Sequence, residues 1–333
     1  MIGLSIIVPV FNAEDSIREC VESLIREAPE DSEIILVDDG STDNSGMICD
    51  YYKNIDDRVF IIHKKNEGVS KARNTGLDFA NGEKVFFLDS DDYLPAGYFK
   101  SMLKDVDLTI SNYYAFYPDQ SSITGSFFSK EYLTRTDFLK DFNIYFATIF
   151  NFPWGKVFRR DIIEQYAIRF RPDIHVSEDV IFNVEYYQCC NTISIIDDVM
   201  VMYRQSLVSL SHTYNHQLFK WYETSYKIIR DCLIDNQAFT DKNRAHYYTQ
   251  FFADTIECLL GAQKDCKETL DDQILQVFNS NLLKDAIPYL RINRYYFIIL
   301  GLKAHNLMCL RAFTRINLNF LSIVRCVKRR IIP

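Results

Sequence analysis

The chain has 333 residues, of which 48% are hydrophobic, 25% charged and 14% aromatic. This composition is typical of globular proteins and excludes the disordered, collagen-like and coiled-coil classes. The length predicts about two domains, with a core large enough to fold without disulfide or metal cross-links. The formal charge of −8 argues against nucleic acid as the main partner of the chain, so no nucleic-acid function is expected.

The first ninety or so residues alternate between short apolar, β-branched segments and segments with apolar residues at helical spacing. Strands are predicted at residues 4–8, 33–37, 59–62 and 84–88, and helices at 17–25, 41–52 and 70–80. This alternation predicts an α/β fold with a mostly parallel sheet flanked by helices. Helical spacing returns from residue 215 to about 290, which predicts an α-helical C-terminal region.

Charge is unevenly distributed along the chain. Residues 286–333 hold nine Lys and Arg and no Asp or Glu, which leaves about −17 on the first 285 residues. In this tail the basic residues are interleaved with apolar and aromatic ones. The pattern fits a helical cap on the rest of the protein, and it also fits a segment lying on an anionic membrane surface, which we favour.

Nine cysteines show neither CxxC pairs nor the Cys/His spacing of a zinc site, so free thiols in a reducing cytosol are expected. The first residues have no basic stretch and no small-residue cleavage site, and no signal peptide is predicted. No run of roughly 18 uncharged apolar residues occurs. These features predict a cytoplasmic protein, peripheral on the inner face of the cell membrane.

A polar cluster follows each of the four predicted strands. In parallel sheets, ligands bind at the carboxyl ends of the strands, so these clusters are expected to meet at one edge. Any one of them could be a solvated turn or a helix cap. Together, however, their aspartates would repel one another without a cation, and carboxylate oxygens suit a hard divalent ion that also binds phosphate. The clusters are Pro9–Glu14, Asp38–Asp43, Asn66–Asn74 and Asp89–Asp92.

The absence of two nucleotide-binding motifs excludes some types of nucleotide site. No G-x-G-x-x-G follows the first strand, and no G-x-x-x-x-G-K-[ST] occurs in the chain. The sequence therefore lacks the motifs that identify a dinucleotide-binding site or a P-loop nucleotide site. A metal-bridged nucleoside diphosphate, with Lys71 or Arg73 as additional cations, accounts better for the polar clusters.

In their order and spacing, these clusters resemble the motifs of family 2 glycosyltransferases, which have the GT-A fold. The resemblance is carried by Ile7–Asn12, Val37–Asp43, Asn66–Asn74 and Leu88–Asp92. It spans roughly residues 4–95, and looser matches follow at Trp154–Phe158 and Ser177–Asp179. The resemblance implies an inverting transferase that takes a sugar from a UDP-sugar donor in the synthesis of bacterial capsular or other surface polysaccharide.

The resemblance assigns five residues to the uridine end of the donor. The backbone of Pro9 and Val10 and the ring of Phe11 would frame the uracil. Asp39 would accept the imide N–H of the base. Glu14 would contact the ribose or the base. The Phe at position 11, where the family often has Tyr, keeps the stacking surface and lacks only a hydroxyl.

Three further residues are assigned to the diphosphate and sugar end. Asp89 would lie near the ribose or the donor sugar, and Arg73 would face the diphosphate or the donor sugar. Asp91 would bind Mn²⁺ or Mg²⁺, because hard cations prefer carboxylate oxygens.

The resemblance also implies an acceptor side. Asp179 would be the catalytic base, and its neighbour Glu178 would contact the acceptor or stabilise the loop. Weaker matches suggest that Trp154 stacks on a sugar and that Arg204 and His212 contact phosphate. Each of these residues also has a purely structural interpretation. Glu178 and Asp179 would be acidic residues favoured at a helix N-terminus, Trp154 would be part of the core, and Arg204 and His212 would form surface ion pairs.

We divide the chain on this basis into residues 1–110, the nucleotide-sugar-binding half, residues 111–213, the acceptor-binding half, and residues 214–333, the helical region. The expected partners are a UDP-sugar and a glycan or lipid-linked acceptor. Two other functions remain open. A nucleotidyltransferase would need a glycine-rich basic loop after the first strand, and a non-catalytic nucleotide-sugar binder would not need both Asp91 and Asp179.

Overall fold

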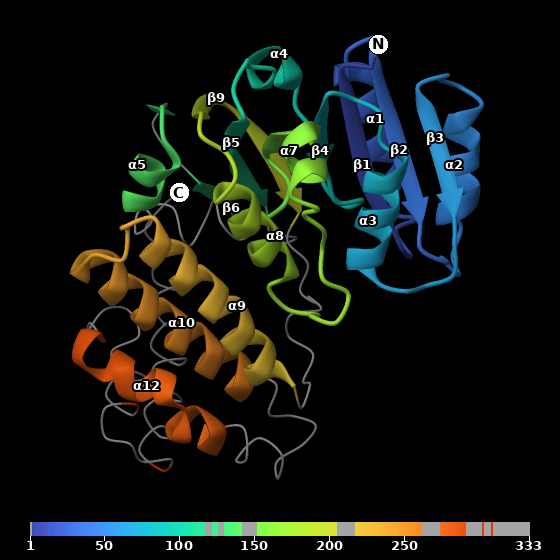
Figure 1. The fold of residues 1–333 in the computed structure, drawn as a ribbon. Coiled ribbons are helices and arrows are strands. Elements are labelled where there is room, and N and C mark those ends of the chain that lie inside the picture. The colour runs from blue at the N-terminus through green and yellow to red at the C-terminus, as the bar shows by residue number, and fades with distance from the viewer. Residues whose placement is uncertain are drawn as a thin grey trace, which may run out of the picture. The chain divides into compact units, whose positions relative to one another are not determined.

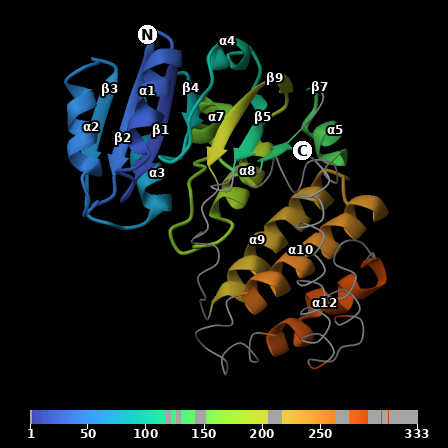
Figure 2. The same ribbon diagram turned by 180° about the vertical axis from the view of Figure 1, so that it is seen from behind.

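The computed structural model describes residues 2–116, 122–125, 130–141, 152–204, 217–261 and 274–290, together with the single positions 302 and 308. The elements appear in Figure 1 and Figure 2 and follow one another in this order: β1 (Leu4–Val10), α1 (Ile17–Glu27), β2 (Ser32–Asp38), α2 (Ser45–Lys53), β3 (Val59–His63), α3 (Val69–Phe79), β4 (Lys84–Phe87), α4 (Tyr98–Met102), β5 (Leu108–Phe116), β6 (Ser122–Gly125), β7 (Lys130–Tyr132), α5 (Arg135–Lys140), β8 (Lys156–Arg159), α7 (Arg160–Gln165), α8 (Glu178–Tyr187), β9 (Ile193–Arg204), α9 (Leu218–Asp235), α10 (Asp241–Gly261), α12 (Asn281–Ala286) and the 3₁₀ turn η2 (Ile287–Tyr289).

Nine strands form one mixed sheet in the described part of the chain, in the order β3-β2-β1-β4-β8-β5-β9-β7, with β6 paired to β5. The strands β3, β2, β1 and β4 run parallel, and β5 runs parallel to β9. β8 lies antiparallel between β4 and β5 and joins these two groups. The predicted α/β class and the four predicted N-terminal strands are confirmed.

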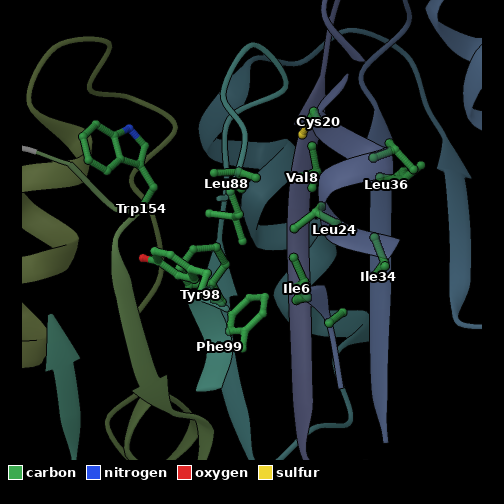
Figure 3. Packing of buried hydrophobic residues seen from close by; sticks show 14 of the residues in the cluster. Ile6, Val8, Cys20, Leu24, Ile34, Leu36, Leu88, Tyr98, Phe99 and Trp154 are labelled. Atoms are coloured by element: carbon green, nitrogen blue, oxygen red, sulfur yellow. The ribbon is translucent and has the colours of Figure 1, made fainter. Parts of the chain in front are cut away.

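Strand β1 lies at the centre of the core. All seven of its residues are buried, which explains why its sequence is a continuous apolar run instead of an alternating one. One face packs against α1, as Figure 3 shows. On the other face Ile7 meets α3, where Gly76 leaves no room for a side chain. The residues labelled on the α1 face are Ile6 and Val8 of β1, Ile34 and Leu36 of β2, and Cys20 and Leu24 of α1.

Helix α2 begins at Ser45, four residues later than predicted. The hydroxyl and acidic side chains from Ser41 onward are typical of a helix start, but long-range contacts hold this segment as a loop. The backbone N–H of Thr42 donates to Asn12 Oδ1 at 2.8 Å, and that of Asn44 donates to Glu14 Oε2 at 3.1 Å. The predicted start at residue 41 is therefore wrong, because the loop after β1 supplies the hydrogen bonds that an added helical turn would have supplied.

Contacts divide the described residues into two compact units. The first contains the described residues up to Leu139 and those from Phe152 to Arg204, and the second contains Lys140, Asp141 and the described residues from 217 onward. In the second unit α9 and α10 pack through aromatic side chains, with ring centroids 3.9 Å apart for Tyr226 and Tyr247. The predicted helical region is confirmed for its described residues.

Several expectations concern features outside the core. Within the described residues, no helix is long and apolar enough to cross a membrane. The basic tail expected to contact a membrane lies at residues 291–333, which are outside the described residues apart from positions 302 and 308. The five cysteines described are free thiols, as expected: Cys20, Cys49, Cys189, Cys190 and Cys232.

The edge of the sheet where β1 and β4 begin depends on a close backbone approach at Gly82. A Cβ at this position would lie 2.5 Å from the backbone nitrogen of Ser5. We expect Gly82→Ala to lower the free energy of unfolding by about 1–3 kcal/mol, because the backbone cannot move aside without disturbing β1. Urea denaturation measures this loss. The neighbouring exposed change Asn81→Ala is the control and should cost about 0.5 kcal/mol or less; equal effects would show that the close approach is not a constraint.

Candidate active site

The carboxyl ends of β1, β2, β3 and β4 lie at one edge of the sheet. Val10 pairs with Asp38, and Asp38 pairs with His63. On the other side of β1 the N–H of Leu88 donates to Ile7 O at 3.1 Å. Parallel pairing therefore brings the loops with the four polar clusters to the same edge, as the sequence predicts.

Phe11 provides an exposed aromatic ring at the end of β1. Its side chain follows the buried strand residues Pro9 and Val10, yet Phe11 is 47% exposed. A large apolar ring in water at the binding edge of such a sheet can stack on a planar base. The structure thus places these three residues at the edge of the sheet where ligands bind in such folds, and their contact with uracil stays a prediction.

The loop after β1 and the loop after β2 hold each other. Asn12 has a left-handed backbone with φ of 48°, and its side-chain oxygen accepts from the backbone of Thr42. Glu14 Oε2 accepts from Asn44 Nδ2 at 2.7 Å as well as from the Asn44 backbone. The carboxylate of Glu14 is therefore already engaged, and a contact with ribose or base, as predicted, would compete with Asn44.

Asp39 is 3% exposed and holds the loop between β3 and α3. Its Oδ2 accepts from the backbone N–H of Gly68 at 2.7 Å, and its Oδ1 accepts from Lys64 Nζ at 2.8 Å. Gly68 has φ of 92°, a conformation that favours glycine. The structure assigns Asp39 a role in shaping this loop, while its predicted contact with the uracil imide stays a prediction.

Arg73 of α3 is a buried cation between two acidic loops. The side chain of Arg73 is 6% exposed; its Nη2 lies 2.8 Å from Asp89 Oδ1, and its Nη1 lies 3.5 Å from Glu178 Oε1. The guanidinium also sits over the Phe170 ring, 5.2 Å from its centroid. The side chain of the next residue, Asn74, holds the backbone of Phe170: its Nδ2 donates to Phe170 O at 2.8 Å, and its Oδ1 accepts from Phe170 N–H at 2.9 Å. Arg73 therefore links the loop after β4 to the start of α8.

The loop after β4 carries carboxyl groups in an unfavourable environment for negative charge. Burial, together with the charge of Asp89, raises the pKa of Asp91 to about 6. Burial also raises the pKa of Asp92 well above its usual range, and Asp92 Oδ2 is a buried atom without a hydrogen-bond partner. These are the features of a site that gains stability when a cation binds.

Arg204, at the end of β9, holds the same loop in place. Its backbone N–H donates to Asp92 Oδ1 at 2.8 Å, and its Nε donates to the carbonyl of Asp91 at 3.1 Å. Its Nη2 pairs with Glu19. Arg204 thus serves the acidic loop directly, and its predicted phosphate contact stays a prediction.

Asp179 lies in the first turn of α8, directly after a strained residue. Ser177 has φ of 68°, which is uncommon for a residue other than glycine and often marks a functional segment. Asp179 Oδ1 accepts from the N–H of Val180 at 2.8 Å. Burial, then the charge of Glu178, raise the pKa of Asp179 to about 8, while Arg73 acts in the opposite direction. Asp179 therefore has the environment of a proton acceptor that works near neutral pH.

Of two weaker predicted contacts, one involves a buried tryptophan and the other lies outside the described residues. Trp154 is 3% exposed and stacks on Phe152 with ring centroids 4.3 Å apart, beside Tyr203. Here the tryptophan packs as part of the core, the alternative that the sequence left open, and its contact with a sugar stays a prediction. His212 lies outside the described residues.

Comparison with known proteins gives a consistent result. Residues 5–167 match the model of the family described as glycosyl transferase family 2. A putative glycosyltransferase, EpsH of Bacillus subtilis, is 31% identical over 241 residues, which cover 69% of this chain and 70% of EpsH. The chain belongs to glycosyl transferase family 2. An uncharacterized glycosyltransferase of the same organism, EpsJ, is 32% identical over 62% of each chain.

The fold of this family 2 glycosyltransferase also resembles solved structures. A crystal structure of S. aureus TarS residues 1–349 in complex with UDP-GlcNAc superposes with a TM-score of 0.68. It covers 93% of this chain and 90% of that one, at 21% sequence identity. At this identity the likeness establishes the TarS-like GT-A fold.

Two residues of the site were not predicted from the sequence. Lys64 neutralises Asp39, and its only signal is that it is the first cation after a predicted strand. Phe170 forms the floor under Arg73, and no pattern around it distinguishes it from a core aromatic. Both act through contacts between segments far apart in the chain, which local spacing does not reveal.

The ion pairs of Arg73 generate a prediction about stability. We expect Arg73→Met to lower the free energy of unfolding by about 3–5 kcal/mol, because the change leaves two partly buried carboxylates without their cation. Urea denaturation measures the loss. Arg169→Met removes an exposed guanidinium that pairs with Asp78 and Glu164 and should cost about 1 kcal/mol or less. Equal costs for the two variants would contradict a central role for Arg73.

Proposed function

We propose that this family 2 glycosyltransferase moves a sugar from a UDP-sugar to a hydroxyl group of a glycan acceptor and inverts the anomeric centre. The observation that carries this proposal is the position of Asp179. This carboxyl group has a raised pKa, and its neighbour Glu178 pairs with Arg73, which also pairs with Asp89 at the edge of the sheet where ligands bind in such folds. One edge of the fold therefore joins a donor site to a proton acceptor.

The proposed donor is a uridine diphosphate sugar. Phe11 would stack on the uracil, framed by the backbone of Pro9 and Val10, and Asp39 would accept the imide N–H. Glu14 would contact the ribose or the base. The complex of TarS with UDP-GlcNAc supports this choice, because the two proteins share their fold over most of this chain.

The diphosphate would lie between Arg73 and Asp91. Arg73 is buried, and its Nε has no hydrogen-bond partner, so the guanidinium retains a donor for a phosphate oxygen. Asp89, which Arg73 holds at 2.8 Å, would lie beside the ribose or the donor sugar. Arg73 would then exchange part of its contact with the carboxylates for contact with the phosphates.

The acidic loop fits Mn²⁺ or Mg²⁺. Asp91 carries the hard carboxylate oxygens that these ions prefer, and its raised pKa indicates an electrostatic environment that a cation would relieve. Among the described residues, no group of three or more His, Cys, Asp or Glu side chains is arranged to hold a metal ion. Asp91 would therefore hold the ion together with oxygens of the donor. When bound, the ion neutralises charge that develops on the leaving diphosphate.

The reaction we propose is a single displacement. The acceptor hydroxyl oxygen forms a bond to the anomeric carbon while the bond from that carbon to the diphosphate oxygen breaks. The hydroxyl proton passes to the carboxylate of Asp179, and UDP leaves with the electron pair. Attack from the face opposite the leaving group inverts the anomeric centre. Glu178, beside Asp179, would contact the acceptor or hold the loop.

For the acceptor, we propose a lipid-linked oligosaccharide used in the synthesis of capsular or other surface polysaccharide. The basic tail supports this choice, because its nine Lys and Arg suit the anionic inner face of a cell membrane. A panel of UDP-sugars incubated with Mn²⁺, with and without glycan acceptors, tests the function as a whole. Release of UDP that depends on one donor and rises with acceptor supports it, whereas no release with any donor in the panel contradicts it.

The role of Asp179 predicts both a rate and a pH dependence. Asp179→Asn should lower kcat by about 10²–10⁴, the range for loss of a positioned base, while the affinity for UDP barely changes. In the wild type, kcat/KM should rise with pH up to about 8, because a base accepts a proton only when it is ionised. The exposed neighbour Asp173→Asn is the control and should retain activity. Loss of UDP binding in folded Asp179→Asn would make Asp179 a donor ligand instead.

The proposed metal predicts a second pH effect. Asp91→Asn should remove most activity without unfolding the protein, and excess EDTA should abolish transfer. Mn²⁺-dependent UDP binding should weaken as pH falls below about 6, because protonated Asp91 no longer attracts a cation. Isothermal calorimetry at several pH values measures this, with the exposed change Asp15→Asn as control. Full activity after EDTA and dialysis would overturn the assignment.

A further inference from the structure

Asn74 of α3 pairs with the backbone of Phe170 in the way that one strand pairs with another. Its side-chain amide donates to Phe170 O at 2.8 Å and accepts from Phe170 N–H at 2.9 Å. One side chain thereby satisfies both polar backbone groups of a residue 96 positions later in the chain. Because Phe170 is only 1% exposed, leaving these backbone groups unpaired would be costly, so the amide of Asn74 holds Phe170 firmly against α3.

The ring of Phe170 extends this contact to α8. It stacks face to face on the Phe182 ring, with centroids 4.1 Å apart and an angle of 2° between the ring planes. Phe182 is fully buried and follows Asp179 by three residues, so the two lie on the same side of the helix. Both phenylalanine rings also meet Phe87 of β4 edge to face, at 5.2 and 5.6 Å. The position of Phe170 therefore helps to set the position of the helix that carries the proposed base.

The same ring contacts the donor side of the site. Arg73, the residue before Asn74, has its guanidinium 5.2 Å from the centroid of the Phe170 ring. In the proposed function this guanidinium faces the donor diphosphate, while Asp179 faces the acceptor hydroxyl. Phe170 thus lies in contact both with the group proposed to bind the leaving diphosphate and with the helix of the proposed base.

A second link between α3 and this segment is weaker. Arg169 Nη2 lies 3.2 Å from Asp78 Oδ1, but the side chain of Asp78 is 67% exposed. The same guanidinium also pairs with Glu164 at 3.1 Å. Exposed ion pairs contribute little, because water and salt screen them. Asn74 therefore holds the segment more strongly than this ion pair does, and Asp78, four residues further along α3, offers a matched control.

We propose that Asn74 is a positioning residue for sugar transfer: by holding Phe170, it fixes the distance between the donor diphosphate at Arg73 and the proposed base Asp179. The inference rests on the proposed function, because it takes Asp179 as the base. Asn74 acts through Phe170 and contacts no reacting atom. Its effect on the rate is expected because a misplacement of about 1 Å between reacting groups can slow a reaction roughly 100-fold.

Steady-state kinetics and calorimetry separate this role from a contact with the donor. Asn74→Ala removes both hydrogen bonds and should lower kcat by about 10–10², while the affinity for UDP with Mn²⁺ changes by less than about threefold. The control Asp78→Asn should leave both values unchanged. An unchanged kcat in Asn74→Ala would overturn the proposal. So would a loss of UDP affinity as large as the loss in kcat, because Asn74 would then act on the donor through Arg73.

A double-mutant cycle with Asp179→Asn tests the path through the base. In the Asp179→Asn background, Asn74→Ala should lower kcat by only about threefold or less, because the group that Asn74 positions is already removed. The same factor in both backgrounds would show that Asn74 only supports the fold, and would overturn the proposal. Full kcat in Asp179→Asn alone would be a failure of the proposed base, and it is told apart because it is seen without any change at Asn74.

Amide hydrogen exchange, followed by mass spectrometry, needs no turnover and covers an unstable variant or an inactive wild type. Asn74→Asp keeps the acceptor for the Phe170 N–H and loses only the donor to Phe170 O, so it disturbs the fold less than Asn74→Ala. Exchange should rise by about tenfold or more in peptides covering residues 168–182 and stay unchanged in β1. Unchanged exchange in residues 168–182 would show that Asn74 does not hold this segment, and would overturn the proposal.

Discussion

The constraint on which the site depends is the repulsion among five carboxyl groups: Asp89, Asp91, Asp92, Glu178 and Asp179. Burial is the largest cause of the raised pKa values of Asp91, Asp92 and Asp179, and the charges of neighbouring carboxylates raise these values further. Arg73 is the cation buried among them, with contacts of 2.8 and 3.5 Å to two of the five. Arg73 and Arg204 do not balance this charge, because the three pKa values stay raised, so the edge of the sheet favours additional cations. A donor that brings its own metal ion would satisfy that need.

These carboxyl groups come from segments that are far apart in the sequence, and the fold brings the segments together. Parallel pairing of β1, β2, β3 and β4 brings the loops with the polar clusters to one edge, and α8, a segment about ninety residues after β4, carries the proposed base Asp179. Two of the positive-φ residues in the described part of the chain stand directly before the helices that carry Arg73 and Asp179. Gly68 begins α3 with positive φ, and Ser177 does the same for α8. The strands therefore supply rigidity while the loops supply chemistry, as is usual where catalytic groups lie on loops at the end of a sheet.

The sequence predicted those features that depend on local periodicity. Strands β1 to β4 and the polar clusters after them could be predicted, because a buried parallel strand is a short run of apolar residues and the loop that follows it is polar. Features that depend on contacts between residues far apart in the sequence could not be predicted. The predicted start of α2 was wrong because Asn12 and Glu14 hold the loop before the helix through hydrogen bonds. Trp154 is buried because it packs against Phe152 and Tyr203, and the residues of its own turn do not indicate this packing.

The central claim is that the edge carrying Arg73 and Asp91 is the donor diphosphate site. A crystal structure of the protein with UDP and Mn²⁺ tests it most directly. The account predicts the uracil against Phe11, the diphosphate within hydrogen-bond distance of Arg73, and the ion bound by Asp91 and phosphate oxygens. Well-ordered UDP bound away from this edge, with Arg73 and Asp91 remote from phosphate and metal, would contradict the account.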